Sequence, residues 1–378
     1  MFKLNHSNIF YKFLLFMPFV AIISNKLSPI IAYAIIGCFL LSFLFFKIQF
    51  NQLKIGLLLY LFFLTIILYI SFIYQQLQYD FNNLYYIQFF GSQLLLLFIF
   101  TLFININYVN NIYLKSFFKT LIYIVFFSVI LDYILLQNGM FESQMMFKAA
   151  ASSYHGKPLG IFGQFSINSS YIVIFYMLYL SFENKLNKTL CMFLFSLVTV
   201  TVLLEDSGTG YIVYCLLIIT IFYKFKIVRY IFLPMGVIIV YFIIQSNLVT
   251  KISYTYLNFL YQYFNEILNV NYVSHIHTIS DILFGIDGNY NFPIDFGPLF
   301  LIAKVGFLYF IFYSIAIFYM IHKAPDRYFK MAIISLVLGN IHYPTLFYPI
   351  MNVLLPLLFI YVINFKKGIL NNEYINKM

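Results

Sequence analysis

The 378-residue chain contains no tryptophan, only two arginines and few charged residues of any kind. Charged side chains make up 9% of the residues and hydrophobic side chains 63%. An ordinary soluble domain carries about 25% charged residues, so this chain has too little polar surface for a globule in water. The composition therefore excludes the common classes of soluble enzyme and indicates a membrane protein.

Cysteine is also scarce, and the apolar residues follow no strand pattern. Cys38, Cys191 and Cys215 all fall inside apolar runs, so no disulfide framework is expected. The apolar runs are continuous, whereas a membrane β-barrel shows alternating segments of about 10 residues. The net charge of +10 comes from residues between the runs, so it does not indicate nucleic-acid binding.

What the chain has in abundance is long apolar runs, which predict an all-α polytopic membrane protein with about twelve (11–12) transmembrane helices. Most runs approach the ~20 residues that cross the hydrocarbon core. We expect one membrane domain over residues 1–378. Pro344 and Pro349 leave open whether the last two runs span fully or form a re-entrant pair. The predicted spans are 9–24, 29–46, 55–74, 86–106, 116–136, 168–183, 189–204, 210–225, 231–246, 297–321, 329–344 and 346–363.

The lysines and arginines predict the orientation. Alternate connections hold 17 of the 22 basic residues, and the positive-inside rule assigns these connections and both termini to the cytoplasm. The opposite side then holds eight of the twelve acidic residues and two long outer loops, residues 137–167 and 247–295. The cytoplasmic connections are too short for a nucleotide-binding domain, so ATP-driven chemistry is not expected.

The larger outer loop, residues 247–295, lies between spans nine and ten. Between residues 252 and 268, apolar side chains recur at steps of three and four, which predicts an amphipathic helix on the membrane surface. His275, His277 and Asp281 follow. His277 and Asp281 would share a helical face, but no second ligand cluster supports a metal, so we expect phosphate or sugar contacts or an ordinary surface loop.

The smaller outer loop ends in a second candidate segment. His155 and Lys157 lie just above the predicted membrane surface beside glycines, which allow a ligand close to the backbone. Lys157 would pair with a phosphate oxygen, or it is an ordinary solvated lysine. The turn at Glu205–Gly210 is similar to a phosphate loop but lacks the final lysine, so a tight turn is expected instead.

Ionisable residues inside predicted spans mark a possible cavity. Lys304 lies nine residues after Asp295, about two and a half turns into the bilayer, where a charge is costly unless it faces a cavity or a partner. Asp132 and His342, near the outer ends of their spans, would line the same cavity or form interhelical hydrogen bonds.

Three segments resemble the bacterial O-antigen and capsular-polysaccharide polymerases of the Wzy type, which are related to the O-antigen ligases. They are Lys157-Pro-Leu-Gly-Ile-Phe-Gly-Gln-Phe-Ser-Ile-Asn168, Ser207-Gly-Thr-Gly210, and Asp295 followed by Leu299, Lys304 and Gly306. Lysine replaces the family's arginine at Lys157, and Gly208 stands where an arginine is usual. Asp295 occupies the place of a ligase histidine, which favours a polymerase.

The resemblance implies a GT-C-like glycosyltransferase in the bacterial cytoplasmic membrane, with no metal or other cofactor. The enzyme would transfer a growing glycan from undecaprenyl diphosphate to the next lipid-linked repeat at the outer face. Its partners would be the bilayer, the lipid-linked oligosaccharide, a chain-length regulator and a flippase. An O-antigen ligase and a lipid-linked oligosaccharide flippase or other transporter are the alternatives. The residues assigned by this reading are Asp295 and then Asp287 as base, and Lys157, His155, Lys251, His275, His277, Lys304 and His342 as substrate-binding residues.

Overall fold

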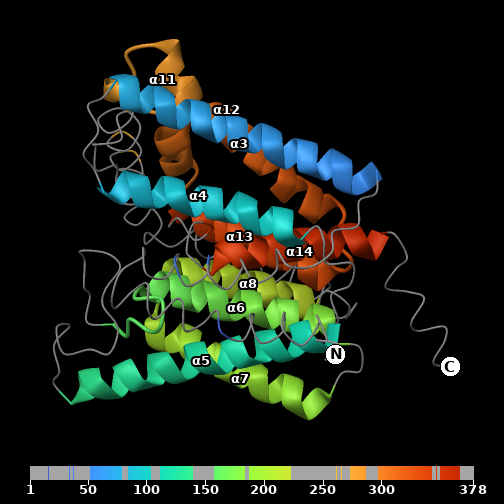
Figure 1. Ribbon diagram of the computed structural model, residues 1–378. Coiled ribbons are helices and arrows are strands. Elements are labelled where there is room, and N and C mark those ends of the chain that lie inside the picture. The colour runs from blue at the N-terminus through green and yellow to red at the C-terminus, as the bar shows by residue number, and fades with distance from the viewer. Residues whose placement is uncertain are drawn as a thin grey trace, which may run out of the picture.

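The computed structural model describes the chain in several stretches. They are residues 52–78, 84–103, 111–138, 157–183, 187–222, 273–286, 297–342 and 350–366, with a few single positions besides. These residues form helices joined by turns, and no strand occurs among them (Figure 1). The predicted all-α class is therefore confirmed for the part of the chain that is described.

Five of the described helices are long and apolar enough to cross a membrane: α3, α5, α6, α7 and α12. This finding confirms the coarse prediction of a polytopic membrane protein. Most of the predicted spans overlap a described helix. Span 231–246 lies outside the described residues, as do spans 9–24 and 29–46 apart from Phe16, Ala34 and Gly37, which are helical. The helices are α3 (Gln52–Gln78), α4 (Leu84–Phe103), α5 (Asn111–Gln137), α6 (Phe165–Phe182), α7 (Lys188–Glu205), α8 (Gly208–Phe222), α11 (Ile279–Phe284), α12 (Gly297–His322), α13 (Arg327–His342) and α14 (Met351–Lys366).

The described helices stack in layers. Figure 1 shows α5 and α7 at one side, followed by α6 with α8, then α13 with α14, then α4, and finally α3 with α12. Helix α6 contacts α5, α7, α8 and α13, and all of its residues except Phe165 and Ser181 are buried. Helix α6 is thus enclosed by the helices on either side of its layer.

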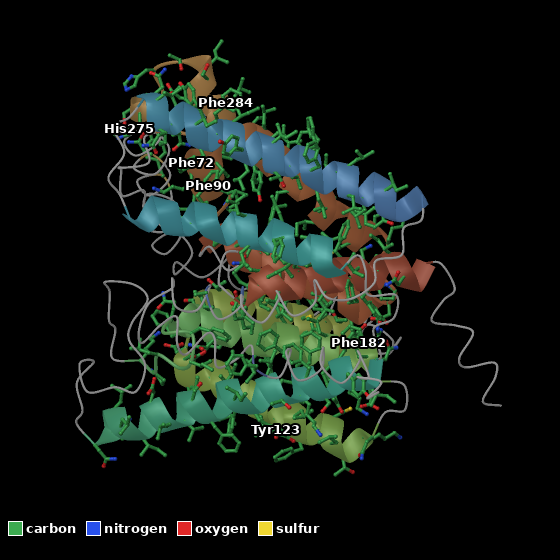
Figure 2. The ribbon with its side chains drawn as sticks, viewed as in Figure 1. Phe72, Phe90, Tyr123, Phe182, His275 and Phe284 are labelled. Atoms are coloured by element: carbon green, nitrogen blue, oxygen red, sulfur yellow. The ribbon has the colours of Figure 1, made fainter. Side chains whose placement is uncertain are left out.

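Aromatic side chains fill the spaces between the layers. The Phe118 and Phe182 rings stack between α5 and α6 with their centres 5.6 Å apart. The ring centres of Phe72 and Phe90 lie 4.7 Å apart between α3 and α4 (Figure 2). Large apolar side chains also cover the outside of the bundle, for instance Phe62 on α3 and Phe318 on α12. A soluble protein rarely exposes such surfaces, and here they suit contact with lipid.

Successive helices run in opposite directions, so their connections gather at two ends of the bundle (Figure 1). One end, called the Lys157 end, holds the loop before α6, the α7–α8 turn and α11. The other end, called the Lys115 end, holds the α6–α7 and α12–α13 connections. At the Lys115 end, Lys115 forms an ion pair of 2.6 Å with Glu183.

The large loop before α12 is only partly described. Its predicted amphipathic helix lies outside the described residues, apart from Tyr261 and Asn265, which are helical and exposed. Its second half contains a short 3₁₀ turn and α11, which packs against α3 and α12. Helix α12 itself is interrupted at Gly306, a break that hydropathy does not reveal.

Candidate functional site

A buried loop leads into α6 at the Lys157 end. Residues 158–164 are all buried, and Asn168 on the first turns of α6 holds them in place. Its Oδ1 accepts from the backbone N–H of Phe162 at 3.1 Å, and its Nδ2 donates to the carbonyls of Gln164, at 2.8 Å, and Leu159. Gly160 has φ +59, and a Cβ there would lie 2.8 Å from the Asn168 side chain, so glycine is required.

Helix α5 supplies two further acceptors to the same loop. Asp132 Oδ2 accepts from the backbone N–H of Gly160 at 2.9 Å, and Ser128 Oγ accepts from that of Ile161 at 3.0 Å. Both side chains are buried. Asp132 was expected to line a cavity or to bridge two helices, and the structure shows it binding the backbone of the loop.

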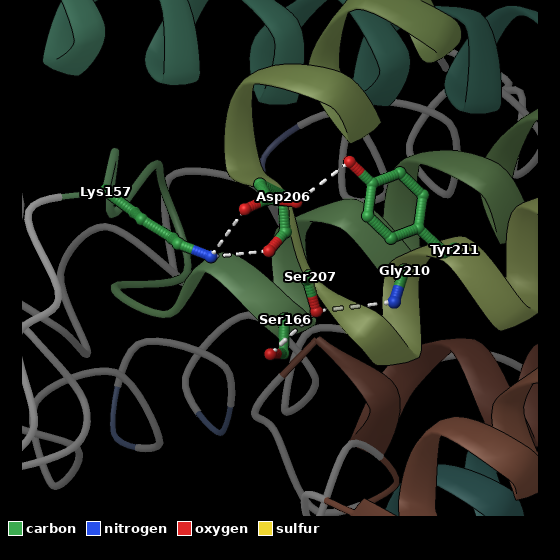
Figure 3. A network of polar contacts seen from close by, with 6 residues as sticks. All are labelled: Lys157, Ser166, Asp206, Ser207, Gly210 and Tyr211. Carbon is green, nitrogen blue, oxygen red and sulfur yellow. Dashed lines mark hydrogen bonds and ion pairs between the residues drawn. The ribbon is translucent and has the colours of Figure 1, made fainter. Parts of the chain in front are cut away.

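The α7–α8 turn packs against the first turns of α6 (Figure 3). Ser207 Oγ donates to Ser166 Oγ at 2.9 Å and accepts from the backbone N–H of Gly210 at 3.3 Å. A Cβ on Gly210 would lie 2.4 Å from Ser169 Oγ, so the absence of a side chain permits this close approach. The expected tight turn is confirmed, and it carries a network of hydroxyl groups.

Lys157 lies over this turn. Its ammonium donates to the backbone carbonyl of Asp206 at 2.5 Å and lies 3.2 Å from Asp206 Oδ2 (Figure 3). The ammonium is also 5.2 Å from the centre of the Phe165 ring, within cation–π range. The side chains of Lys157 and Asp206 are 28% and 65% exposed, so an anion from solution can reach this pair.

Asp206 itself is held by two groups. The Tyr211 hydroxyl donates to its Oδ1 at 3.0 Å, and this bond, followed by the interaction with Lys157, lowers the pKa of the Asp206 carboxyl below its ordinary value. Its backbone is in the left-handed region at φ +44, which Asp tolerates better than most residues. Asp206 is therefore ionised at neutral pH and neutralises part of the charge of Lys157.

Glu205 directly precedes Asp206 in the chain and is completely buried. The Asn168 side chain interacts with the Glu205 carboxylate. Neither carboxylate oxygen forms a hydrogen bond of good geometry with the described residues, and the same holds for Gln164 Nε2. The sequence suggested only an acidic residue in an outward turn. One feature of the sequence could have predicted its burial. Glu205 is the last residue of an apolar run, and a helix still buries one face at that point.

A second group of predicted residues surrounds α11. The Asp281 carboxylate accepts from the backbone N–H groups of His277, at 2.9 Å, and Thr278, at 2.7 Å, and from the Tyr74 hydroxyl at 2.8 Å. The expectation that His277 and Asp281 share a helical face is wrong, because Thr278 caps α11 and His277 precedes the helix. His275 is half-buried in the preceding turn.

The described residues place the candidates in two groups. Lys157 contacts the α7–α8 turn and α6, whereas the His275–Asp281 segment contacts α3, and Lys304 lies buried on the neighbouring α12. No three histidine, cysteine or acidic side chains within the described part lie close enough to hold a metal ion. The predicted residues His155, Lys251, Asp287 and Asp295 lie outside the described residues, as does the side chain of His342 at the end of α13.

Comparison with known proteins gives no match to this chain among family models, curated proteins or solved structures.

Proposed function

We propose that the protein polymerises lipid-linked oligosaccharide repeat units, as the resemblance implies. One observation carries the proposal. The segments Lys157–Asn168 and Ser207–Gly210 were singled out from the sequence separately, and they meet at the end of α6 through the Ser166–Ser207 hydrogen bond and the contact of Lys157 with Asp206. This convergence supports a shared site that uses an exposed cation.

The proposed reaction needs a cation and a base. The acceptor sugar hydroxyl attacks the anomeric carbon of the donor glycan, the bond from that carbon to the diphosphate oxygen breaks, and undecaprenyl diphosphate leaves with the electron pair. Lys157 would stabilise the charge that develops on the diphosphate, exchanging its Asp206 contact for phosphate oxygens. Asp295, with Asp287 second, remains the proposed acceptor of the hydroxyl proton.

The charge distribution between the two ends supports an outward-facing site. Most basic residues near the ends of the described helices lie at the Lys115 end, which the positive-inside rule assigns to the cytoplasm. The Lys157 end would then face outward, where lipid-linked repeats are displayed. The basic residues at the Lys115 end include Lys115, Lys119, Lys188, Lys323, Arg327 and Lys330.

Polymer length in cells tests the proposal. In a strain that depends on this protein, Lys157→Gln should collapse the ladder of surface polysaccharide to single repeats, while Lys157→Arg should retain longer chains. Lys188→Gln, which changes an exposed lysine at the Lys115 end, should leave the ladder intact. A complete ladder from Lys157→Gln at normal protein level would remove Lys157 from the site. The same readout with Asp295→Asn tests the proposed base.

A flippase is the second candidate, because interrupted helices such as α12 are common in transporters. The two functions differ in the intermediate that accumulates without the protein. Loss of a polymerase leaves lipid-linked repeats at the outer face, and loss of a flippase leaves them at the inner face. Loss of a ligase, the other alternative, would leave long polymer on the carrier lipid.

A further inference from the structure

Helix α12 is divided at Gly306, two residues after Lys304. The Gly306 backbone has φ +88 and ψ 163, and a Cβ there would lie 2.1 Å from the carbonyl oxygen of Leu283 on α11. An interruption inside an apolar helix leaves backbone carbonyls without their usual partners, which is costly away from water. The carbonyls of Ala303 and Lys304 therefore need donors from elsewhere.

Two other segments supply those donors. The backbone N–H of Ile286 donates to the Ala303 carbonyl at 2.9 Å. The Gln75 Nε2 group on α3 donates to the Lys304 carbonyl at 3.0 Å and to the Phe284 carbonyl at 2.7 Å. Gln75 is completely buried, so a single amide group joins the break in α12 to the end of α11.

The fit around this amide is close. Gly285 has φ +100, and a Cβ there would lie 2.2 Å from Gln75 Nε2 and 2.9 Å from the Ala303 carbonyl. Ser71, one turn earlier on α3, also donates to the Phe284 carbonyl. The two N–H groups of this primary amide have three acceptors within reach, the Lys304 and Phe284 carbonyls and Ser71 Oγ at 3.3 Å. No apolar side chain of similar size can satisfy them.

Lys304 is 9% exposed and is the residue whose carbonyl Gln75 holds. Its side chain starts from the last turn before the break, so the geometry of the break determines where its ammonium can reach. We propose that Gln75 is a positioning residue that fixes Lys304 to receive the diphosphate of the lipid carrier. The inference rests on the proposed function for the role of Lys304.

A double-mutant cycle on carrier binding tests this inference. The purified full chain in lipid nanodiscs is titrated with undecaprenyl diphosphate, using Gln75→Leu, Lys304→Met and the double variant. Each single variant should weaken binding about tenfold, and the double variant should bind no more weakly than Lys304→Met, because Gln75 acts through Lys304. Gln76→Leu, an exposed neighbour on α3, should bind like the wild type.

Gln75→Glu provides a variant that keeps the size of the side chain. When ionised, its carboxylate would face the Lys304 and Phe284 carbonyls without a donor, and when protonated it would have one donor. Carrier binding by this variant should therefore recover as the pH falls, relative to the wild type at each pH. The other titratable groups around this position are Tyr74 on α3, Asp281 on α11 and Lys304 on α12, and all remain in both proteins.

Several outcomes would overturn the inference. Wild-type affinity in Gln75→Leu, or losses in the two single variants that multiply in the double variant, would show that Gln75 does not act through Lys304. Absence of binding by the wild type would overturn it as well. If any of these binding results is found while the wild type still forms polymer, the role of Gln75 is wrong and the proposed polymerase function is unaffected. If the double-mutant cycle gives the expected binding losses but the wild type forms no polymer, the proposed polymerase function is wrong and the role of Gln75 in carrier binding is supported.

Discussion

Lys157 and Asp206 hold each other through two contacts of different kinds. The ammonium donates to the backbone carbonyl of Asp206 at 2.5 Å and lies 3.2 Å from its carboxylate. The first contact uses the backbone of Asp206 and not its side chain, whereas the second depends on the carboxylate. A substitution of the Asp206 side chain can therefore remove the negative charge beside Lys157 while keeping the backbone contact that holds the lysine in place.

Replacing Asp206 with asparagine should strengthen donor binding. The change removes the carboxylate that competes with phosphate for Lys157 and leaves the backbone contact. Because exposed ion pairs are weak, we expect the KM for the lipid-linked donor to fall by about two- to threefold. Steady-state polymerisation with purified protein measures this, and an increased KM would show that Asp206 assists binding. Asp326→Asn, at the Lys115 end, is the control.

The lowered pKa of Asp206 predicts how acid affects the fold. A carboxyl whose pKa is lower in the folded state stabilises it above the pKa of the unfolded chain, about 3.9, and this stabilisation disappears as pH falls through the lowered value. The wild type should therefore unfold at a slightly higher temperature than Asp206→Asn at pH 5 to 7. Thermal unfolding in detergent should show the two converging only in stronger acid. A gap that widens with acidification would contradict this interpretation.

Gly210 and Gly208 form a matched pair in the first turn of α8. A Cβ on Gly210 would lie 2.4 Å from Ser169 Oγ and 2.6 Å from Ser169 Cβ, whereas a Cβ on Gly208 meets nothing within 4 Å. Gly210→Ala should reduce the free energy of unfolding by about 1–3 kcal/mol through overpacking. Gly208→Ala should be neutral or slightly stabilising. Unfolding in detergent distinguishes the two, and equal effects would place α8 farther from α6.

Asn168→Ala should loosen the loop before α6. The change removes three hydrogen bonds and leaves buried backbone groups of Leu159, Phe162 and Gln164 without this partner. We expect a loss of about 3 kcal/mol in unfolding free energy, since each buried group left unsatisfied costs about 1–3 kcal/mol. Ser170→Ala removes one bond within α6 and should cost less than about 1.5 kcal/mol. Similar losses in both variants would contradict the role of Asn168.

Two buried glutamates should respond in opposite directions to glutamine. Glu205 is completely buried and pairs with no cation among the described residues, and a glutamine can keep its contact with the Asn168 side chain. Glu205→Gln therefore removes the cost of burying an acid and should leave stability unchanged or raise it by about 1 kcal/mol. Glu183 pairs with Lys115 and accepts from the Tyr179 hydroxyl, so Glu183→Gln should destabilise the fold. Unfolding of both variants in detergent checks the contrast. Strong destabilisation by Glu205→Gln would indicate a cationic partner for that carboxyl.

Hydropathy was sufficient to predict most of the helices, because each apolar run lies in one segment of the chain. The bounds of α5 and α7 agree with the predicted spans 116–136 and 189–204 within a few residues. The proximity of Lys157 to the α7–α8 turn was not predicted, although the resemblance named both segments. Nothing in the local pattern of either segment encodes a contact over that separation.

The break in α12 could not be predicted, because its causes lie outside the helix. Gly306 sits in an apolar run that contains one charged residue, Lys304, and an isolated glycine there is compatible with a continuous helix. The conformation depends on the Leu283 carbonyl and on the amide of Gln75, which is 229 residues from Lys304. The burial of Glu205 escaped prediction for the same reason, since helices packed around α7 create it.

The burial of α6 has a consequence for how the protein is made. A helix that reaches the bilayer alone must be apolar by itself, and α6 carries Ser166, Asn168, Ser169 and Ser170 in its first two turns. Its neighbours cover these groups only after they have arrived. We expect α6 to insert inefficiently as a single segment and efficiently when synthesised with α5 and α7. Glycosylation mapping in microsomes measures this by comparing α6 alone with a segment that contains α5, α6 and α7. Equal insertion of α6 in both would show that it enters the bilayer unaided.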